Sequence, residues 1–241
     1  MDIQLYSKNK HHILYDAEQV PQITEQWFVP DWWQKEAQVS EPSGGRGQAF
    51  FIHRHNPQSD LVLRHYRRGG LAAKISADYY LFSGLEKSRA WQEFKLTQQL
   101  FESGLPVPRP IAAHIQRVGL FYQADLLTER LPDTQPFARY LNDHNELDDQ
   151  QRQHLWQQVG KTIALFHRAG LNHSDLNANN ILVNTLQQVW LIDFDRCQLQ
   201  PPSPQWQRKN LARLQRSILK LSQKSELPTA LWAKLEAAYQ S

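Results

Sequence analysis

Short apolar runs bounded by turn residues mark the first half of the chain. Two of them, residues 49–52 and 61–66, are separated by a segment rich in turn formers, Asn56-Pro57-Gln58-Ser59-Asp60. Two more, residues 111–116 and 120–127, follow a proline-rich stretch that avoids helical geometry. Apolar runs of this length between turns are typical of strands, so the first half is predicted to be β-rich.

The second half changes to helical periodicity. Apolar residues recur at helical spacing in residues 148–169, as they do earlier in residues 88–103, and a glycine follows each segment. Residues 205–239 are also predicted to be helical. Two short β-like runs lie between, at 181–183 and 189–192. The break at residues 128–133 predicts a linker, so we expect a β-rich lobe over 1–130 and a mainly helical lobe over 131–241, in one α+β domain.

The bulk composition narrows the class of protein. With 241 residues, 41% of them hydrophobic, the chain can form one large domain or two small lobes that share a cleft. No apolar stretch reaches the roughly 18 residues of a membrane span, and the N-terminus lacks the apolar region of a secretory signal. One cysteine, Cys197, excludes an intrachain disulfide. These features favour a cytoplasmic location.

The first 40 residues carry an aromatic cluster around Pro30. Its members either pack on the domain or touch a membrane interface, where Trp is favoured. Packing is the preferred interpretation. The cluster consists of Trp27, Phe28, Trp32 and Trp33.

Asp175, Asn180 and Asp193 have a spacing that predicts a chemical site. The first two lie in a loop directly before the run at 181–183, and Asp193 directly follows the run at 189–192. A hairpin of these two strands would bring the three side chains together. Mg²⁺ takes hard oxygen ligands and keeps nucleotide phosphates among them. Asn180 and Asp193 could supply such ligands, while Asp175 could deprotonate an attacking hydroxyl. Asp and Asn also decorate ordinary turns, but the combined spacing favours the site.

Three segments carry a family resemblance. His173-Ser174-Asp175-Leu176-Asn177-Ala178-Asn179-Asn180-Ile181-Leu182, with Asp193-Phe194-Asp195 after it, has the catalytic-loop and metal-loop pattern of protein-kinase-like phosphotransferases. Together with Leu63-Arg64-His65-Tyr66-Arg67-Arg68-Gly69-Gly70 and Gly104-Leu105-Pro106-Val107-Pro108, it resembles the lipopolysaccharide kinase family from about residue 44 to about residue 220. The resemblance implies a bilobal protein-kinase-like fold, with a β-rich N-lobe, a helical C-lobe and the active site in the cleft.

The resemblance also implies roles for the motif residues. Asp175 matches the catalytic base, and Asn180 and Asp193 match the ligands of Mg²⁺. Asp195 replaces the glycine of the protein-kinase Asp-Phe-Gly motif. A second acid at this place is similar to small-molecule and sugar kinases, so protein substrates are not expected.

The ATP phosphates need further contacts. Gly44, Gly45 and Gly47 stand where a glycine-rich loop would cover them, although the spacing differs from that of protein kinases. Arg64 occupies the position of the phosphate-binding lysine, and Glu93 on the helix at 88–103 is its expected partner. Arg and Lys are not interchangeable at such a site, so Lys74 stays a second candidate for the cation.

For the acceptor, the resemblance implies the 4-hydroxyl of 3-deoxy-D-manno-octulosonic acid (Kdo) on a lipid A precursor. This anionic glycolipid would be met by peripheral association with the cytoplasmic face of the bacterial inner membrane. The chain has two basic clusters: Arg64, Arg67 and Arg68, and then Arg208, Lys209, Arg213, Arg216 and Lys220. Of these, Arg67, Arg68, Arg208, Arg213 and Arg216 would suit the acceptor. No nucleic acid and no obligate protein partner are expected.

Three other functions stay open at this point. One is another enzyme of the same fold, a heptose kinase of the lipopolysaccharide core or an aminoglycoside-type phosphotransferase, although the basic cluster disfavours a cationic acceptor. The second is a nucleotide-binding pseudokinase scaffold, which the intact Asp175, Asn180 and Asp193 disfavour. The third is a nucleic-acid-binding protein that uses the basic segment at 205–221.

Overall fold

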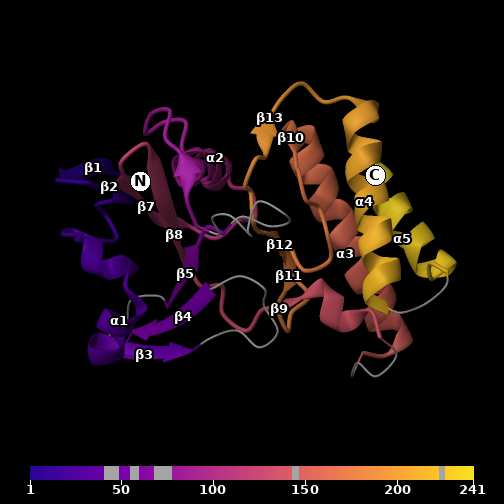
Figure 1. Ribbon diagram of the computed structural model, residues 1–241. Coiled ribbons are helices and arrows are strands. Elements are labelled where there is room, and N and C mark those ends of the chain that lie inside the picture. Colours follow the sequence, from indigo (N-terminus) through magenta and orange to yellow (C-terminus); the bar gives the residue numbers. More distant parts are fainter. Residues whose placement is uncertain (41–48, 55–59, 68–77, 143–146, 223–225) are drawn as a thin grey trace. The chain divides into compact units, whose positions relative to one another are not determined.

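The computed structural model describes residues 1–40, 49–54, 60–67, 78–142, 147–222 and 226–241. It has a mixed α+β fold with two compact units. Unit 1 comprises residues 1–102 and 108–131 and is rich in strands. Unit 2 comprises residues 103–107 and 132–241 and carries most of the helices. Figure 1 labels the elements of both units.

Unit 1 is built on one antiparallel sheet, with the strand order β1-β2-β7-β8-β5-β4-β3 and β6 beside β8. All of the four strand runs expected between residues 49 and 127 are confirmed. The bounds are β1 Ile3–Lys8, β2 His11–Asp16, β3 Ala37–Ser40, β4 Ala49–Arg54, β5 Leu61–His65, β6 Tyr80–Leu81, β7 Pro110–Val118 and β8 Phe121–Glu129.

Alternation along the strands gives this sheet two apolar faces. Ala113 and Leu126 point to one face, where α2 (Arg89–Glu102) packs through Ala90 and Phe94. Their neighbours in sequence point to the other face, where they form a second buried cluster. That second face is covered by the 3-10 helix η1 (Glu25–Phe28) and by α1 (Pro30–Glu36).

The N-terminal aromatic cluster packs against the sheet, as the sequence favours. Phe28 and Trp33 are buried, and Trp27 and Trp32 are partly buried against the same core. The Trp33 indole Nε1 donates to the carbonyl oxygen of Trp27 at 2.8 Å. Residues 1–36 therefore extend and cover the sheet of unit 1.

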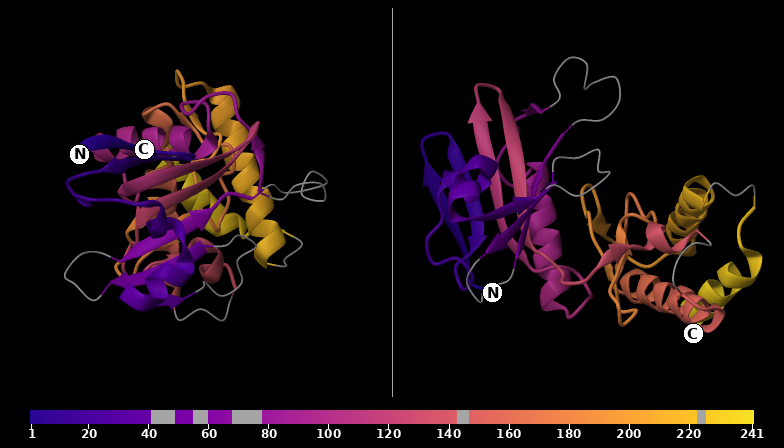
Figure 2. Two further views of the ribbon diagram at one scale, coloured as in Figure 1. Left: turned by 60° about the vertical axis from the view of Figure 1, so that its left-hand side comes forward. Right: turned by 90° about the horizontal axis from the view of Figure 1, so that it is seen from below.

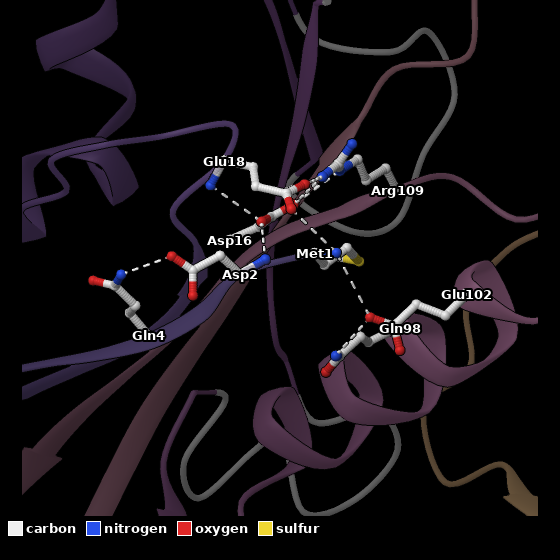
Figure 3. Close-up of polar contacts among 8 residues, drawn as sticks. All are labelled: Met1, Asp2, Gln4, Asp16, Glu18, Gln98, Glu102 and Arg109. Atoms are coloured by element: carbon white, nitrogen blue, oxygen red, sulfur yellow. Dashed lines mark hydrogen bonds and ion pairs between the residues drawn. The ribbon is translucent and has the colours of Figure 1, made fainter.

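A buried ion pair ties the N-terminal strands to β7 (Figure 3). Arg109 donates through Nη2 to Asp16 Oδ2 and to Glu18 Oε2, at 2.6 Å each. Asp16 is fully buried, and Glu18 is about half exposed. The amino group of Met1 lies 3.4 Å from Glu18 Oε1 and 4.0 Å from Glu102 Oε1, which adds the end of α2 to the cluster.

Unit 2 contains three helices and short strands in its described residues. Asp148 caps α3 by accepting from the backbone N–H of Gln151, whose side chain bonds back to Asp148 N–H. The helical character expected over 205–239 is confirmed in the described residues, where two helices form. The bounds are β9 Gln135–Pro136, η3 Phe137–Tyr140, α3 Asp149–Arg168, β10 Leu171–Asn172, β11 Ile181–Val183, β12 Val189–Leu191, β13 Gln198–Leu199, α4 Pro204–Ser222 and α5 Thr229–Gln240.

Two glycines allow close packing in unit 2. A Cβ on Gly160, in the middle of α3, would lie 2.2 Å from the carbonyl oxygen of Leu235, so α5 approaches α3 at this point. Gly170 ends α3 with a φ of +85°, and a Cβ there would lie 2.5 Å from the carbonyl oxygen of Gln200. Any larger residue at either position would force these segments apart.

Candidate active site

The hairpin predicted after the Asp175 loop is present in unit 2. β11 and β12 pair antiparallel, with Ile181 opposite Leu191. The pairing continues one step further, where Ile192 N–H donates to Asn180 O at 3.0 Å. Asn180 therefore enters the hairpin beside the point where Asp193 leaves it, and the loop at 173–180 lies next to residues 192–195.

Backbone and side-chain bonds fix Asp175 and Asn180 to one another. Asn180 Nδ2 donates to the backbone oxygen of Asp175 at 3.0 Å, which orients the Asn180 carboxamide. Asn177 Nδ2 donates to Asp175 Oδ2 at 3.0 Å. The oxygen of Asn177 accepts in turn from the N–H groups of Asn179 and Asn180, at 2.8 and 3.2 Å. Asp175 is exposed, so its carboxylate can reach a substrate, whereas Asn180 is buried.

His173 braces the loop through both ring nitrogens. Its Nε2 lies 3.2 Å from the carbonyl oxygen of Ile192, and its Nδ1 accepts from the N–H of Asp175 at 3.2 Å. Burial lowers the pKa of His173, which keeps the ring neutral and able to donate through one nitrogen and accept through the other. Ser174 adds a second tie, since its hydroxyl donates to Asp195 O at 2.7 Å.

Asp193 has an unusual backbone. Its φ is +64°, in the left-handed region that residues other than glycine seldom occupy. The next residue, Phe194, is buried and packs near Phe166 and His173, with ring centroids 6.3 and 5.5 Å away. The anchored Phe194 ring and the hairpin hold Asp193 in this conformation, and such outliers cluster at functional sites.

Sequence reasoning missed Asn210, which supports the loop from α4. With its carboxamide oriented to satisfy both neighbours, Asn210 nitrogen lies 2.7 Å from His173 O and its oxygen 3.3 Å from His173 N. Ser217, two turns along α4, accepts from the N–H of Ala178 at 3.1 Å. The available signal was a polar residue on an apolar helical stripe, since Trp206, Asn210, Leu214 and Ile218 are all buried.

In unit 1, Arg64 pairs with Glu93 as predicted. Arg64 Nη2 lies 2.5 Å from Glu93 Oε2 and 3.0 Å from the hydroxyl oxygen of Tyr66. The Tyr66 hydroxyl donates to the same oxygen of Glu93. Glu93 is only 3% exposed, while the Arg64 side chain keeps 27% of its surface in solvent. The Arg64 guanidinium is therefore held in place by Glu93 and Tyr66, and part of its surface remains accessible to a ligand.

The other predicted phosphate contacts lie outside the described residues. These are Gly44, Gly45, Gly47, Lys74 and Arg68. Arg67 is described and lies 3.5 Å from Asp78 through its Nε.

A pocket of about 560 Å³ opens on the opposite face of the unit 1 sheet from Arg64. Phe28, Phe50, His65 and Asp125 contribute to its wall. Asp125 bridges two strands, with Oδ1 at 2.6 Å from His65 Nδ1 and Oδ2 at 2.9 Å from His114 Nδ1. The Asp125 hydrogen bond raises the pKa of His65. Since adjacent residues of β5 point to opposite faces, this pocket and the Arg64 side chain are separate features.

Metal binding can be tested against the donors present. In the described part of the chain, no group of three or more His, Cys, Asp or Glu side chains is arranged to hold a metal. Asn180 and Asp193 offer two oxygen donors from adjoining segments. Mg²⁺ in kinases takes few protein ligands and completes its shell with nucleotide phosphates and water, so these two residues fit that ion when a nucleotide is present.

Comparisons with known proteins agree with the motif. Residues 30–239 match the family described as "Lipopolysaccharide kinase (Kdo/WaaP) family". A 3-deoxy-D-manno-octulosonic acid kinase of Xanthomonas campestris pv. campestris (strain B100) is 46% identical over 87% of this chain and 80% of its own length. Enzymes with the same name from Vibrio vulnificus (strain CMCP6) and Vibrio parahaemolyticus are 43% and 41% identical, over 86% and 90% of this chain and 85% and 88% of their own lengths. Because the family model matches most of the chain, and because these relatives are 41–46% identical to it over most of its length, the chain belongs to the lipopolysaccharide kinase (Kdo/WaaP) family.

Proposed function

We propose that this protein is an ATP-dependent kinase that phosphorylates the 4-hydroxyl of Kdo on a Kdo-lipid A acceptor. The observation that carries the proposal is the ordered loop in which Asn177 and Asn180 fix an exposed Asp175 beside Asp193. The relatives named above as Kdo kinases, 41–46% identical over most of the chain, support the choice of acceptor.

Asp175 acts as the general base in this proposal. The acceptor oxygen forms a bond to the γ-phosphorus while the bond from that phosphorus to the β,γ-bridging oxygen breaks, and ADP leaves. The hydroxyl proton passes to the Asp175 carboxylate, whose Oδ2 is held by Asn177. Because the loop is held by Asn180, His173 and Ser174, the base needs little reorganisation before the transfer.

Two kinds of contact bind the phosphates in the proposal. Asn180 and Asp193 would hold Mg²⁺, which would neutralise negative charge on the nucleotide phosphates. Arg64, oriented by Glu93 and Tyr66, binds phosphate oxygens through its guanidinium group. Gly44, Gly45 and Gly47 are proposed to cover the phosphates.

The acceptor places the enzyme at the cytoplasmic face of the inner membrane. No helix among the described residues is long and apolar enough to cross a bilayer. We therefore propose peripheral association, in which exposed cations meet an anionic surface. On α4, Arg208, Lys209, Arg216 and Lys220 are exposed.

The test is transfer of label from γ-³²P-ATP to a panel of purified acceptors. Kdo-lipid A should be labelled, while lipid A without Kdo, heptosylated core and an aminoglycoside should not. Asp175→Asn, which keeps the size of the side chain, serves as the inactive control. Preferred labelling of heptosylated core or of the aminoglycoside would replace the proposed acceptor, and label released only to water would refute the transferase.

A further inference from the structure

One end of the unit 1 sheet carries an exposed apolar cluster. In the described part of the chain nine large hydrophobic side chains are exposed, and five of them gather here: Tyr79, Leu81, Val118, Leu120 and Phe121. Leu120 is 77% exposed and Leu81 is 65% exposed. A contiguous apolar patch of this kind marks an interaction surface more often than a scatter of single residues does.

Strand pairing explains why these side chains lie together. Phe121 is opposite Val118 across β7 and β8, and it is opposite Leu81 across β8 and β6. Residues directly opposite one another in antiparallel strands point to the same face. Tyr79 directly precedes β6, while Gly119 and Leu120 form the two-residue turn that ends the β7–β8 hairpin.

A second hairpin turn places cations beside this cluster. β1 and β2 are joined by Asn9 and Lys10, and β2 pairs with β7 so that His11 is opposite Gln116. The N–H of Arg117 donates to the carbonyl oxygen of Lys10 at 2.8 Å, which joins the two hairpin ends directly. The right-hand view of Figure 2 shows the β1–β2 and β7–β8 hairpins side by side. Lys8, Lys10 and Arg117 are all exposed.

The charge of this end is mainly positive, although Glu25, which accepts from the Tyr6 hydroxyl at 3.4 Å, lies near Lys8 and His11. Residues 8–12, 79–82 and 116–123, all of them described, contain three Lys or Arg and no Asp or Glu. The nearest acid in sequence, Asp78, lies 3.5 Å from Arg67 and 3.8 Å from His65 and is thereby paired. The guanidinium of Arg117 lies 4.5 Å from the centroid of the Phe82 ring, so its charge borders the apolar cluster.

We infer that this end of unit 1, the hairpin-tip surface formed by the apolar cluster with Lys8, Lys10 and Arg117, docks on a bilayer with anionic headgroups. Leu120 and Phe121 enter the boundary between headgroups and acyl chains, and the cations meet the lipid phosphates. A surface with apolar groups beside a mainly cationic rim fits such a bilayer, since an ordinary protein partner would be expected to meet mixed charge. The inference deepens the proposed function, because it names the surface by which the kinase would reach a membrane-bound acceptor.

The test is co-sedimentation of the full chain with vesicles of phosphatidylcholine, with and without phosphatidylglycerol. Wild-type protein should bind only the anionic vesicles, and salt should weaken the binding. Leu120→Ser should weaken it roughly tenfold, since the side chain loses its apolar contact. The double variant Lys8→Gln/Lys10→Gln should weaken it by roughly fivefold for each charge removed.

Matched controls come from unit 2. Leu186 is 76% exposed in the turn between β11 and β12, so Leu186→Ser removes an equally exposed leucine elsewhere. Lys161→Gln/Lys234→Gln removes two exposed charges from α3 and α5. Both controls should bind vesicles like the wild type. Equal binding by all variants, or no binding by the wild type, would overturn the inference.

Two further readouts separate the possible failures. Sedimentation velocity without lipid tests the rival occupant, a second copy of the chain; a wild-type dimer that Leu120→Ser converts to a monomer would overturn the bilayer assignment. Activity on a deacylated, water-soluble Kdo acceptor tests the proposed function independently. Leu120→Ser should keep full activity there while it loses activity on vesicle-bound acceptor. If the wild type were inactive on both acceptors, the proposed function would be refuted. The measured binding to anionic vesicles would still stand.

Discussion

Arg64 on β5 and Glu93 on α2 form an ion pair in the interior of unit 1, with 2.5 Å between Nη2 and Oε2. The Tyr66 hydroxyl donates to the same carboxylate oxygen, and its ring lies 4.7 Å below the guanidinium carbon of Arg64. These contacts fix the arginine that the sequence nominates as the phosphate-binding cation. The sequence left two candidates for the phosphate-binding cation, and only Arg64 lies in the described residues.

Arg64→Met should weaken ATP binding by roughly tenfold to a hundredfold, because a charge-assisted hydrogen bond contributes about 1.5–3 kcal/mol. Isothermal titration calorimetry with ATP and Mg²⁺ measures it. Lys74→Met is the matched variant and should leave the affinity within a factor of about three. The reverse order, with Lys74 critical and Arg64 dispensable, would assign the phosphates to Lys74.

Asp175→Ala should lower kcat by roughly 10²–10⁴-fold, the usual contribution of a general base. Nucleotide affinity should stay near that of the wild type, since Asp175 is not among the proposed metal ligands. Rapid-quench measurement of phosphoryl transfer, together with ATP titration, separates the two quantities. Undiminished turnover would remove Asp175 from its proposed role.

Asn210→Ala should lower kcat without a matching loss of ATP affinity. Asn210 holds the peptide of His173, two residues before Asp175, so its loss loosens the base rather than the phosphate site. Hydrogen exchange of residues 173–180 should become faster in the variant. The exposed neighbour Lys209→Ala is the control, and equal exchange in both variants would show that Asn210 does not support the loop.

The stability of the protein should fall in acid because of His167. Burial lowers the pKa of His167 to about 4 from an ordinary value of 6.5, and the ring packs edge-on against Trp206 and Tyr239. Between these two pKa values, His167 is protonated in the unfolded chain and neutral in the folded chain. The free energy of unfolding therefore decreases as the pH falls. The expected loss is roughly 3 kcal/mol between pH 7 and pH 4.

Urea denaturation of the wild type and of His167→Phe across this range measures the effect. The variant should lose less stability than the wild type, because it lacks this titration. Parallel losses in the two proteins would show that His167 is not the group responsible.

The Arg109–Asp16 pair should hold the N-terminal strands in place. Asp16→Asn leaves the partly buried guanidinium with one charged partner instead of two and should cost about 3 kcal/mol of stability. Glu18→Gln removes the exposed partner of the same arginine and should change stability much less. Thermal unfolding of both variants checks the prediction, and equal effects would contradict the assignment of Asp16 as the main partner.

Local pattern was enough to predict the parts that carry the proposed chemistry. The hairpin of β11 and β12 and the loop before it follow from two short apolar runs and the spacing of Asp175, Asn180 and Asp193. The helix stops at Gly104 and Gly170 also follow from sequence, since both have a φ that favours glycine.

Contacts between residues far apart in sequence could not be predicted from local patterns. β2 pairs with β7 across about a hundred residues, with His11 opposite Gln116, so nothing near residue 11 signals it. The contact of Gly160 with Leu235 depends on the approach of α5 to α3, which the helical pattern of residues 205–239 does not reveal. Asn210 contacts the backbone of His173, which lies far from it in sequence and close to it only in the folded chain.

The most direct measurement is the position of the phosphate on the product. Kdo-lipid A would be incubated with the enzyme and ATP, and the product examined by ³¹P–¹H correlation NMR. The proposed function predicts a phosphomonoester coupled to H-4 of Kdo, absent when Asp175→Asn replaces the wild type. A phosphate coupled to another sugar proton, or release of inorganic phosphate without any product, would contradict it.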